Sequence, residues 1–308
     1  MTGLYVQAAH HAVLPTRDDR HPPRPRFVEY QADLHRMAGV VLDEATLTRG
    51  DQYTFVDLAD ALADRTGPGL FRDLGVLVTS YWTPEFDPDV SAFGPYLHHR
   101  HRLDCTSFDL VDQGSISPAL ALLVLCDFLR AGPADHDGLL LSVEQTTVPA
   151  PVGAHFPGPS RSTAGAVRIG RRPAGTEILT VTALGEPAVL GDDGDLSRLV
   201  ARWCAEYDVD PAELTVRVNR ATFLYRRWAY AYGPDSWPCR VEFLPPERTC
   251  TGLFRWLGAE STTPAGGYVA YVEEDVESLS AAVVVLRRSP AEQYRRGSSR
   301  DPETARRP

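Results

Sequence analysis

The chain has 308 residues, a mass of 33.9 kDa and 43% apolar residues, which is enough for a full core in one large domain or two smaller ones. Its 31 basic and 41 acidic residues leave a net charge of −10, which argues against a nucleic-acid groove as its main function. Every basic residue is arginine, so Schiff-base and P-loop lysine chemistry are excluded.

The cysteines and the apolar segments indicate a cytoplasmic protein. The first 15 residues have no basic start followed by a long apolar run, so we expect no signal peptide. No uninterrupted apolar window reaches the roughly 18 residues of a membrane span, so we expect no membrane association. The five cysteines are scattered, odd in number and without a C-x-x-C pair, which favours reduced thiols over a disulfide framework or a zinc site.

The first half begins with helical and strand patterns that are separated by a Pro-rich loop. Residues 27–64 form two helical stretches, and the β-rich run at 75–79 predicts a buried strand. Residues 81–95 hold several Pro and Gly residues and predict a loop. Residues 108–110 are a candidate short strand.

The most apolar helix of the chain follows this short strand. Ser117-Pro118 predicts a helix start, with a capping Ser and with Pro at the first helical position. The helix to about Arg130 is apolar nearly all round, so we expect it to be buried on every side. Residues 139–144 predict another interior strand.

The second half repeats the alternation of strands and helices. We expect strands at 178–182, 215–219 and 281–286, and helices at 196–207, 221–232 and 268–276, with a further helix start at 210–213. The alternation predicts an α/β protein with mostly parallel sheets. The Pro-, Gly- and Ser-rich residues 149–163 suggest a link, which gives halves at 1–150 and 151–288 and a disordered tail at 289–308.

One segment resembles a known family. Phe108-Asp109-Leu110 leads through Gly114-Ser115 into the buried helix, which ends at Arg130-Ala131-Gly132 before the strand to Glu144. This order resembles the nucleophile region of the thiolase superfamily, in its ketoacyl-ACP synthase III-like branch, where a Cys nucleophile begins the buried helix. Counting back from Gly132 places Ser115 at that Cys. The likeness covers most of residues 1–150 and the second half loosely, and it implies a duplicated α-β-α-β-α layered fold that dimerises through its central sheets.

The chemistry expected at Ser115 depends on a base. The start of a buried helix offers free N–H groups and the positive end of the helix dipole, which favour a thiolate or a developing oxyanion. A serine hydroxyl ionises far less readily and needs a general base to act as a nucleophile. The alternative is that Ser115 is a small turn residue or a helix cap.

The resemblance also shows what this chain lacks. The family uses a His and an Asn on strand-to-helix turns of the second half, to hold the thioester carbonyl and drive decarboxylation. The corresponding segments here are Val216 to Arg220, without His, and Leu257 to Ser261, without Asn, and no His follows His155. Asn219, the single Asn of the chain, and Arg220 are the candidate substrate-binding residues. The family's Gly-rich loop is also missing between Val276 and Ala281, so we expect no decarboxylative condensation.

Two charged patches have open interpretations. His98-His99-Arg100-His101-Arg102 would hold an anionic group or end a helix near a subunit interface more readily than it would hold a metal. Arg220, Arg226 and Arg227, among aromatic residues, would hold a phosphopantetheine or an acidic carrier protein, or form a solvated face. The polar run 144–147 suggests interface hydrogen bonds.

Three functions stay open from the sequence. The first is a degenerate synthase III-like subunit of fatty-acid or polyketide-type secondary metabolism, forming a homo- or heterodimer with a ketosynthase-like subunit. The second is an acyltransferase with Ser115 as nucleophile, whose base would be a first-half His, with His98, His99 or His101 as candidates, or the acceptor amine itself. The third is a non-enzymatic acyl or carrier-protein binding module. No cofactor is expected, because acyl-CoA or the phosphopantetheine of an acyl carrier protein would be the substrate.

Overall fold

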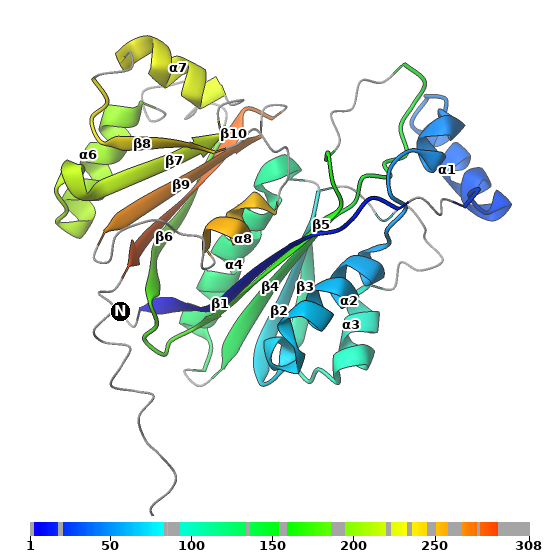
Figure 1. Ribbon diagram of the computed structural model, residues 1–308, viewed down its shortest axis with the longest axis horizontal. Coiled ribbons are helices and arrows are strands. Elements are labelled where there is room, and N and C mark those ends of the chain that lie inside the picture. The colour runs from blue at the N-terminus through cyan, green and yellow to red at the C-terminus, as the bar shows by residue number, and fades with distance from the viewer. Residues whose placement is uncertain are drawn as a thin grey trace, which may run out of the picture.

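The computed structural model describes residues 3–17, 21–82, 85, 93–111, 113–133, 136–153, 159–185, 195–219, 223–232, 236–244, 251–257, 267–275 and 278–288. The strands in these residues are β1 (Leu4–Val13), β2 (Leu74–Tyr81), β3 (Thr106–Val111), β4 (Asp137–Glu144), β5 (Thr163–Gly170), β6 (Thr176–Leu184), β7 (Leu214–Asn219), β8 (Arg240–Leu244), β9 (Tyr268–Asp275) and β10 (Ser280–Arg288). Together they form one continuous sheet (Figure 1).

The sheet is an internal duplication. Its strand order is β3-β2-β4-β5-β1-β6-β10-β9-β7-β8. The first group is β1 to β5 and the second is β6 to β10. From the outer edge of the sheet inward, each group places its third strand first, followed by its second, fourth, fifth and first strands. In each group the fifth strand is antiparallel to both of its neighbours. The two groups join only where residues 4–6 of β1 pair with residues 176–178 of β6. This repeat confirms the expected duplicated α/β architecture.

Helices cover both faces of each group of strands. They are α1 (Pro25–Met37), α2 (Phe55–Thr66), α3 (Phe93–His101), α4 (Ser117–Ala131), α6 (Leu196–Tyr207), α7 (Phe223–Tyr232) and α8 (Gly252–Leu257). α4 contacts β2, β3 and β4 of the first group and β6 and β10 of the second, so it lies between the two, beside α8 (Figure 1). α2 and α3 cover the outer face of the first group, and α6 and α7 cover that of the second. The layers therefore alternate α-β-α-β-α.

Several expected elements are corrected by the structure. Residues 268–275 are strand β9 rather than a helix, because they lie between β10 and β7 as an interior strand. Five of the nine strand pairings in the described residues are antiparallel, so the sheet is mixed rather than mostly parallel. β5 belongs to the first group of strands. The boundary between the two halves therefore lies between Gly170 and Thr176 rather than at residue 150, where it was expected. The expected tail, 289–308, lies outside the described residues.

α4 is the central helix of the molecule, but it is not buried on every side. The stretch Gly114–Ala131, which is α4 with the turn before it, is long enough and apolar enough to cross a membrane. Half of it is buried inside the protein, as is typical of the core helix of a protein that does not span a membrane. Val124 and Phe128 are 38% and 41% exposed, and the Phe128 ring lies beside Phe108 of the edge strand β3. Ser117 is the first helical residue rather than a cap, and its hydroxyl donates to the Gly114 carbonyl.

Arg171 closes the carboxyl end of α4. Its Nη2 donates to the carbonyl oxygens of Leu129, Arg130 and Gly132, at 3.1 and 3.0 Å for the last two. We expect Arg171→Ala to lower the free energy of unfolding by about 2 kcal/mol, because terminal carbonyls and the helix dipole lose a cation. Urea denaturation measures the change. Arg172→Ala is the matched control, since the Arg172 side chain is 75% exposed and pairs with Asp137 rather than with the end of α4. An equal loss in both variants would contradict the capping role.

Candidate functional site

Ser115 lies in the turn Gly114–Ile116, directly before α4, as the sequence predicts. It is partly buried against the end of β9. Its hydroxyl donates to the backbone carbonyl of Glu274 at 3.0 Å, and its backbone N–H donates to Oδ1 of Asp275 at 3.4 Å. The hydroxyl that would act as a nucleophile and the N–H that would stabilise an oxyanion therefore both have hydrogen-bond partners within the chain.

The Asp275 carboxylate fills the space in front of the helix start. It also accepts the N–H of Ser278 at 2.9 Å and the hydroxyl of Ser278 at 2.6 Å. A Cβ on Gly114 would lie 2.2 Å from Asp275 Oδ1, and Gly114 has φ +59°, so only glycine fits here. Asp275 is 7% exposed. A negative charge of the protein itself thus occupies the position where a helix start would stabilise a reacting oxyanion.

Two further acidic residues precede Asp275 on β9. The pKa of Glu273 is raised to about 8, mainly by burial. The hydrogen bond that the Tyr271 hydroxyl donates to Glu273 opposes the rise, and the charges of Glu274 and Asp275 add to it. The Glu274 carboxylate accepts the backbone N–H of Leu224, at the start of α7, at 2.8 Å. β9 therefore ties the starts of α4 and α7 together through acidic residues.

None of the expected bases reaches Ser115. His98, His99 and His101 lie on α3, which precedes β3, whereas Ser115 follows it, so they are at opposite ends of a strand about 20 Å long. His98 binds Ser107 through Nε2 at 2.7 Å, and His101 stacks on Phe71. Burial lowers the pKa of His101. The hypothesis that a histidine of this patch acts as the base for Ser115 is wrong, because the patch and Ser115 lie at opposite ends of β3.

The described cysteines do not supply a nucleophile either. Burial raises the pKa of Cys126 to about 12, in the interior of α4, and that of Cys239 to about 12. Burial also raises the pKa of Cys105 and of Cys204. A raised pKa keeps each thiol protonated and unreactive at neutral pH.

One second-half segment lies where it was expected and the other does not. Asn219 ends β7, and Glu274 contacts both Ser115 and Leu224, so the start of α7 lies near Ser115. The side chain of Asn219 and all of Arg220 lie outside the described residues. Leu257 is the last residue of α8, so the expected Asn segment 257–261 begins at the end of a helix. The residues between β8 and α8 are 245–251, and none of them is Asn.

A buried polar cluster at the end of β4 is an internal feature, not the expected interface. Glu144, Gln145 and Thr147 have no measurable exposure. Thr163 donates to Glu144 at 3.3 Å, Thr163 and Thr251 share a hydrogen bond of 2.7 Å, and His11 Nε2 lies 3.1 Å from the Thr251 hydroxyl. The same position in the second group of strands is held by Asp275 and Ser280. Glu144 of β4 pairs with Thr163 of β5, and Asp275 of β9 pairs with Ser280 of β10, at the corresponding end of each strand pair. Sequence reasoning singled out the run 144–147 but missed its partners Thr163, Thr251 and His11, since they come from other strands and from the turn before α8.

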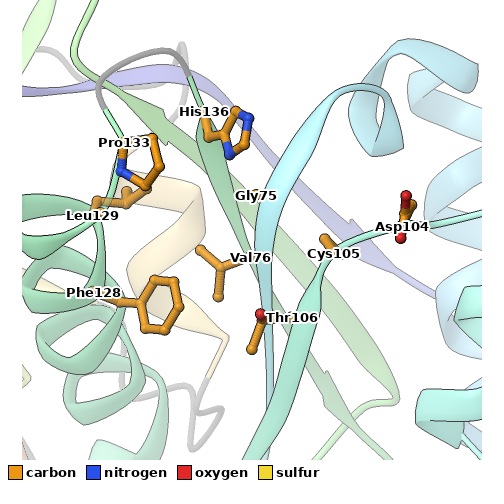
Figure 2. Close-up of a pocket in the computed structure, with 10 residues that line it drawn as sticks. Gly75, Val76, Asp104, Cys105, Thr106, Phe128, Leu129, Pro133 and His136 are labelled. Atoms are coloured by element: carbon orange, nitrogen blue, oxygen red, sulfur yellow. The ribbon is translucent and has the colours of Figure 1, made fainter.

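A hollow of about 460 Å³ lies far from Ser115. Figure 2 shows Phe128 and Leu129 of α4, Val76 of β2 and Thr106 of β3 around it, with His136 at its rim. The hollow is at the carboxyl end of α4, and Ser115 precedes the amino end, about 20 Å away for 15 helical residues. Among the described residues, no group of three His, Cys, Asp or Glu side chains could hold a metal ion.

Solved structures share this architecture. ChlB3, an acyltransferase, is 16% identical with a TM-score of 0.58 and covers 94% of this chain and 99% of that one. A Cys-to-Ser variant of Xanthomonas campestris OleA, with bound lauric acid and lauroyl-CoA, is 12% identical (TM-score 0.58; 92% and 99% covered). The β-ketoacyl-[acyl carrier protein] synthase III of Thermus thermophilus is 15% identical (TM-score 0.55; 93% and 100% covered).

The chain has the thiolase fold. The sequence matches no protein-family model and no curated protein. At these identities the likeness to condensing enzymes concerns the fold, and the chemistry depends on the residues of this chain.

Proposed function

We propose that this chain is a catalytically degenerate, synthase III-like subunit that pairs with an intact condensing enzyme of fatty-acid or polyketide-type metabolism. One observation carries the proposal: the Asp275 carboxylate lies against Ser115 N–H and the Gly114 turn, before the central helix. In a thiolase fold, this is the position at which the reacting thioester would be held.

The charge of Asp275 opposes every step of acyl transfer at this position. A fixed carboxylate repels a developing oxyanion, and each lost oxyanion donor costs about 3–4 kcal/mol of transition-state stabilisation. The Ser115 hydroxyl donates to a carbonyl, which cannot take its proton. Without a base, a serine hydroxyl at neutral pH is a poor nucleophile.

The pairing surface that we propose is the edge of the first group of strands. β3 ends the strand order, and Thr106, Ser107 and Asp109 are exposed along it. The rings of Phe108 and Phe128 lie 6.2 Å apart beside this edge, and Val124 extends the same apolar face. An exposed edge strand with adjacent apolar side chains is suited to adding a strand from another subunit.

A second candidate is an acyl-thioester binding module without turnover. The OleA variant with Ser in place of Cys was solved with lauroyl-CoA bound, so a thiolase fold with that substitution holds an acyl thioester. This candidate predicts binding of acyl-CoA without a covalent product, and it also requires Asp275 to leave room for the thioester.

Intact mass spectrometry after incubation with acetyl-, malonyl- and lauroyl-CoA tests the proposal. We expect no acyl adduct on the wild-type chain, because in the described part of the structure the Ser115 hydroxyl donates to a carbonyl rather than to a base, and Asp275 occupies the Ser115 N–H. An adduct that is absent from Ser115→Ala would support the Ser-dependent acyltransferase and overturn the proposal. Co-expression with a condensing enzyme encoded nearby tests pairing: Phe128→Glu should abolish the complex, whereas Tyr230→Glu, 95% exposed on α7, should leave it intact.

A further inference from the structure

A second hollow, of about 500 Å³, lies at the amino ends of β2 and β3, beside the end of α3. Three segments line it: the turn Pro68–Phe71 with the residues that follow it, the last residues of α3, and the segment that leads into β3. We call it the α3 hollow. Its volume is within the range of small-molecule sites. Ser115 follows the opposite end of β3, so the α3 hollow is not part of the site described above.

Charged side chains of both signs line the α3 hollow without pairing with one another. Four of them have no hydrogen-bond or ion-pair partner among the described residues: Arg72, Asp73, Arg102 and Asp104. Figure 2 shows Asp104 on the side of β3 away from α4. The third arginine of the hollow, Arg100, pairs with Asp60 at 3.9 Å. The charges therefore cancel in number, and what distinguishes the hollow is that cations and anions stand apart around one space.

The sheet register places the two unpaired arginines at the same edge of the sheet. β2 and β3 are parallel neighbours, and Val76 of β2 pairs with Thr106 of β3. Arg72 and Arg102 each lie four residues before this pair, on segments that lead into strands about 4.8 Å apart. Two guanidinium groups on one hollow suit a phosphate group, because each donates charge-assisted hydrogen bonds to its oxygens.

Arg102 occupies a backbone position at which glycine is usual. α3 ends in a turn of the Schellman type, in which the Leu103 N–H donates to the His98 carbonyl at 3.0 Å. Arg102 is the residue of this turn in the left-handed conformation, with φ +52°. Glycine adopts that conformation without the steric cost of a side chain. A contact with a ligand explains an arginine that is unfavourable for the backbone and has no side-chain partner in the described part of the chain.

We propose that the α3 hollow binds a phosphate monoester of a hydroxyl-bearing metabolite, the chemistry shared by sugar phosphates and nucleotides. Arg72 and Arg102 hold the phosphate, and the carboxylates of Asp73 and Asp104 accept hydrogen bonds from the hydroxyl groups. A small inorganic anion fits less well, because the two carboxylates repel it. The site uses neither Ser115 nor the β9 acids, so its test and the acylation experiment fail independently.

Isothermal titration calorimetry of the purified full chain tests the site at constant ionic strength, with ribose 5-phosphate, AMP, ribose and inorganic phosphate as probes. We expect a Kd below about 1 mM for at least one of the two esters, and binding at least about 10-fold weaker for ribose and for inorganic phosphate. The ester that binds more tightly identifies the source as a sugar phosphate or a nucleotide. A wild-type chain that binds neither ester at about 10 mM, or binds inorganic phosphate equally well, overturns the proposal.

Three variants locate the ligand. Arg102→Gly should weaken ester binding at least about 10-fold while its melting temperature is no lower than that of the wild type, because glycine relieves the left-handed backbone. Asp104→Ala should weaken ester binding but strengthen that of inorganic phosphate, because it removes both an acceptor for hydroxyl groups and a repelling charge. Arg202→Ala, which removes an exposed arginine of α6, is the control and should change neither. Ester binding that is unchanged in Arg102→Gly lies elsewhere and contradicts the assignment.

Discussion

Asp275→Ala is expected to lower the free energy of unfolding by about 3 kcal/mol and to create a site for small carboxylates at the start of α4. The variant leaves the partly buried Ser115 N–H without its acceptor, and a buried unsatisfied donor costs about 1–3 kcal/mol. It also removes the hydrogen bonds that the more exposed Ser278 donates through its N–H and its hydroxyl, which cost less because water and Ser280 can replace the acceptor. Formate or acetate should occupy the vacated position and recover part of the loss, since N–H groups at a helix start bind anions. Thermal denaturation against formate concentration measures both effects.

Asp275→Asn is the control for this experiment. The amide has a similar shape and keeps one acceptor oxygen, so it should lose less stability than alanine and should not bind formate. Wild-type protein should be insensitive to formate at the same ionic strength. Equal formate dependence in the wild type and in Asp275→Ala would contradict the view that the carboxylate occupies an anion site.

Glu273 is expected to make the protein less stable as the pH rises from about 5 to about 8. Its pKa is raised from 4.5 to about 8 by burial, so the folded state holds a proton that the unfolded state releases at lower pH. The stabilisation is fully present below pH 4.5 and is lost as the pH rises through the folded pKa. Over this range the loss is on the order of 4 kcal/mol.

Glu273→Gln removes this titration while keeping the size of the side chain. The melting temperature of the variant should vary much less between pH 5 and 8 than that of the wild type, and the two should differ most at pH 8. Glu29→Gln, an exposed substitution on α1, is the control and should follow the wild-type curve. Parallel curves for Glu273→Gln and the wild type would show that Glu273 is not the group that titrates.

These two residues also explain why the family resemblance could not be extended to activity from sequence. The Gly-Ser turn and the apolar helix after it are local features, and both lie where the sequence placed them. The Asp275 carboxylate and the Glu274 carbonyl that contact Ser115 come from β9, about 160 residues later, in a segment that the sequence pattern predicted to be a helix. Residues 268–272 of this strand are apolar on both faces because the strand is interior, so they lack the two-residue alternation of a half-buried strand.

The sequence alone determined the parts of this protein that depend on residue identity. It excluded a lysine, a second Asn and any His after residue 155, and therefore the family's His and Asn partners for Ser115. Only the tertiary structure decided which groups meet. It separated His98, His99 and His101 from Ser115 by the length of β3, and it brought Asp275 against the start of α4. Local patterns determine strands and helices, whereas the contacts of a site depend on how distant strands are ordered in the sheet.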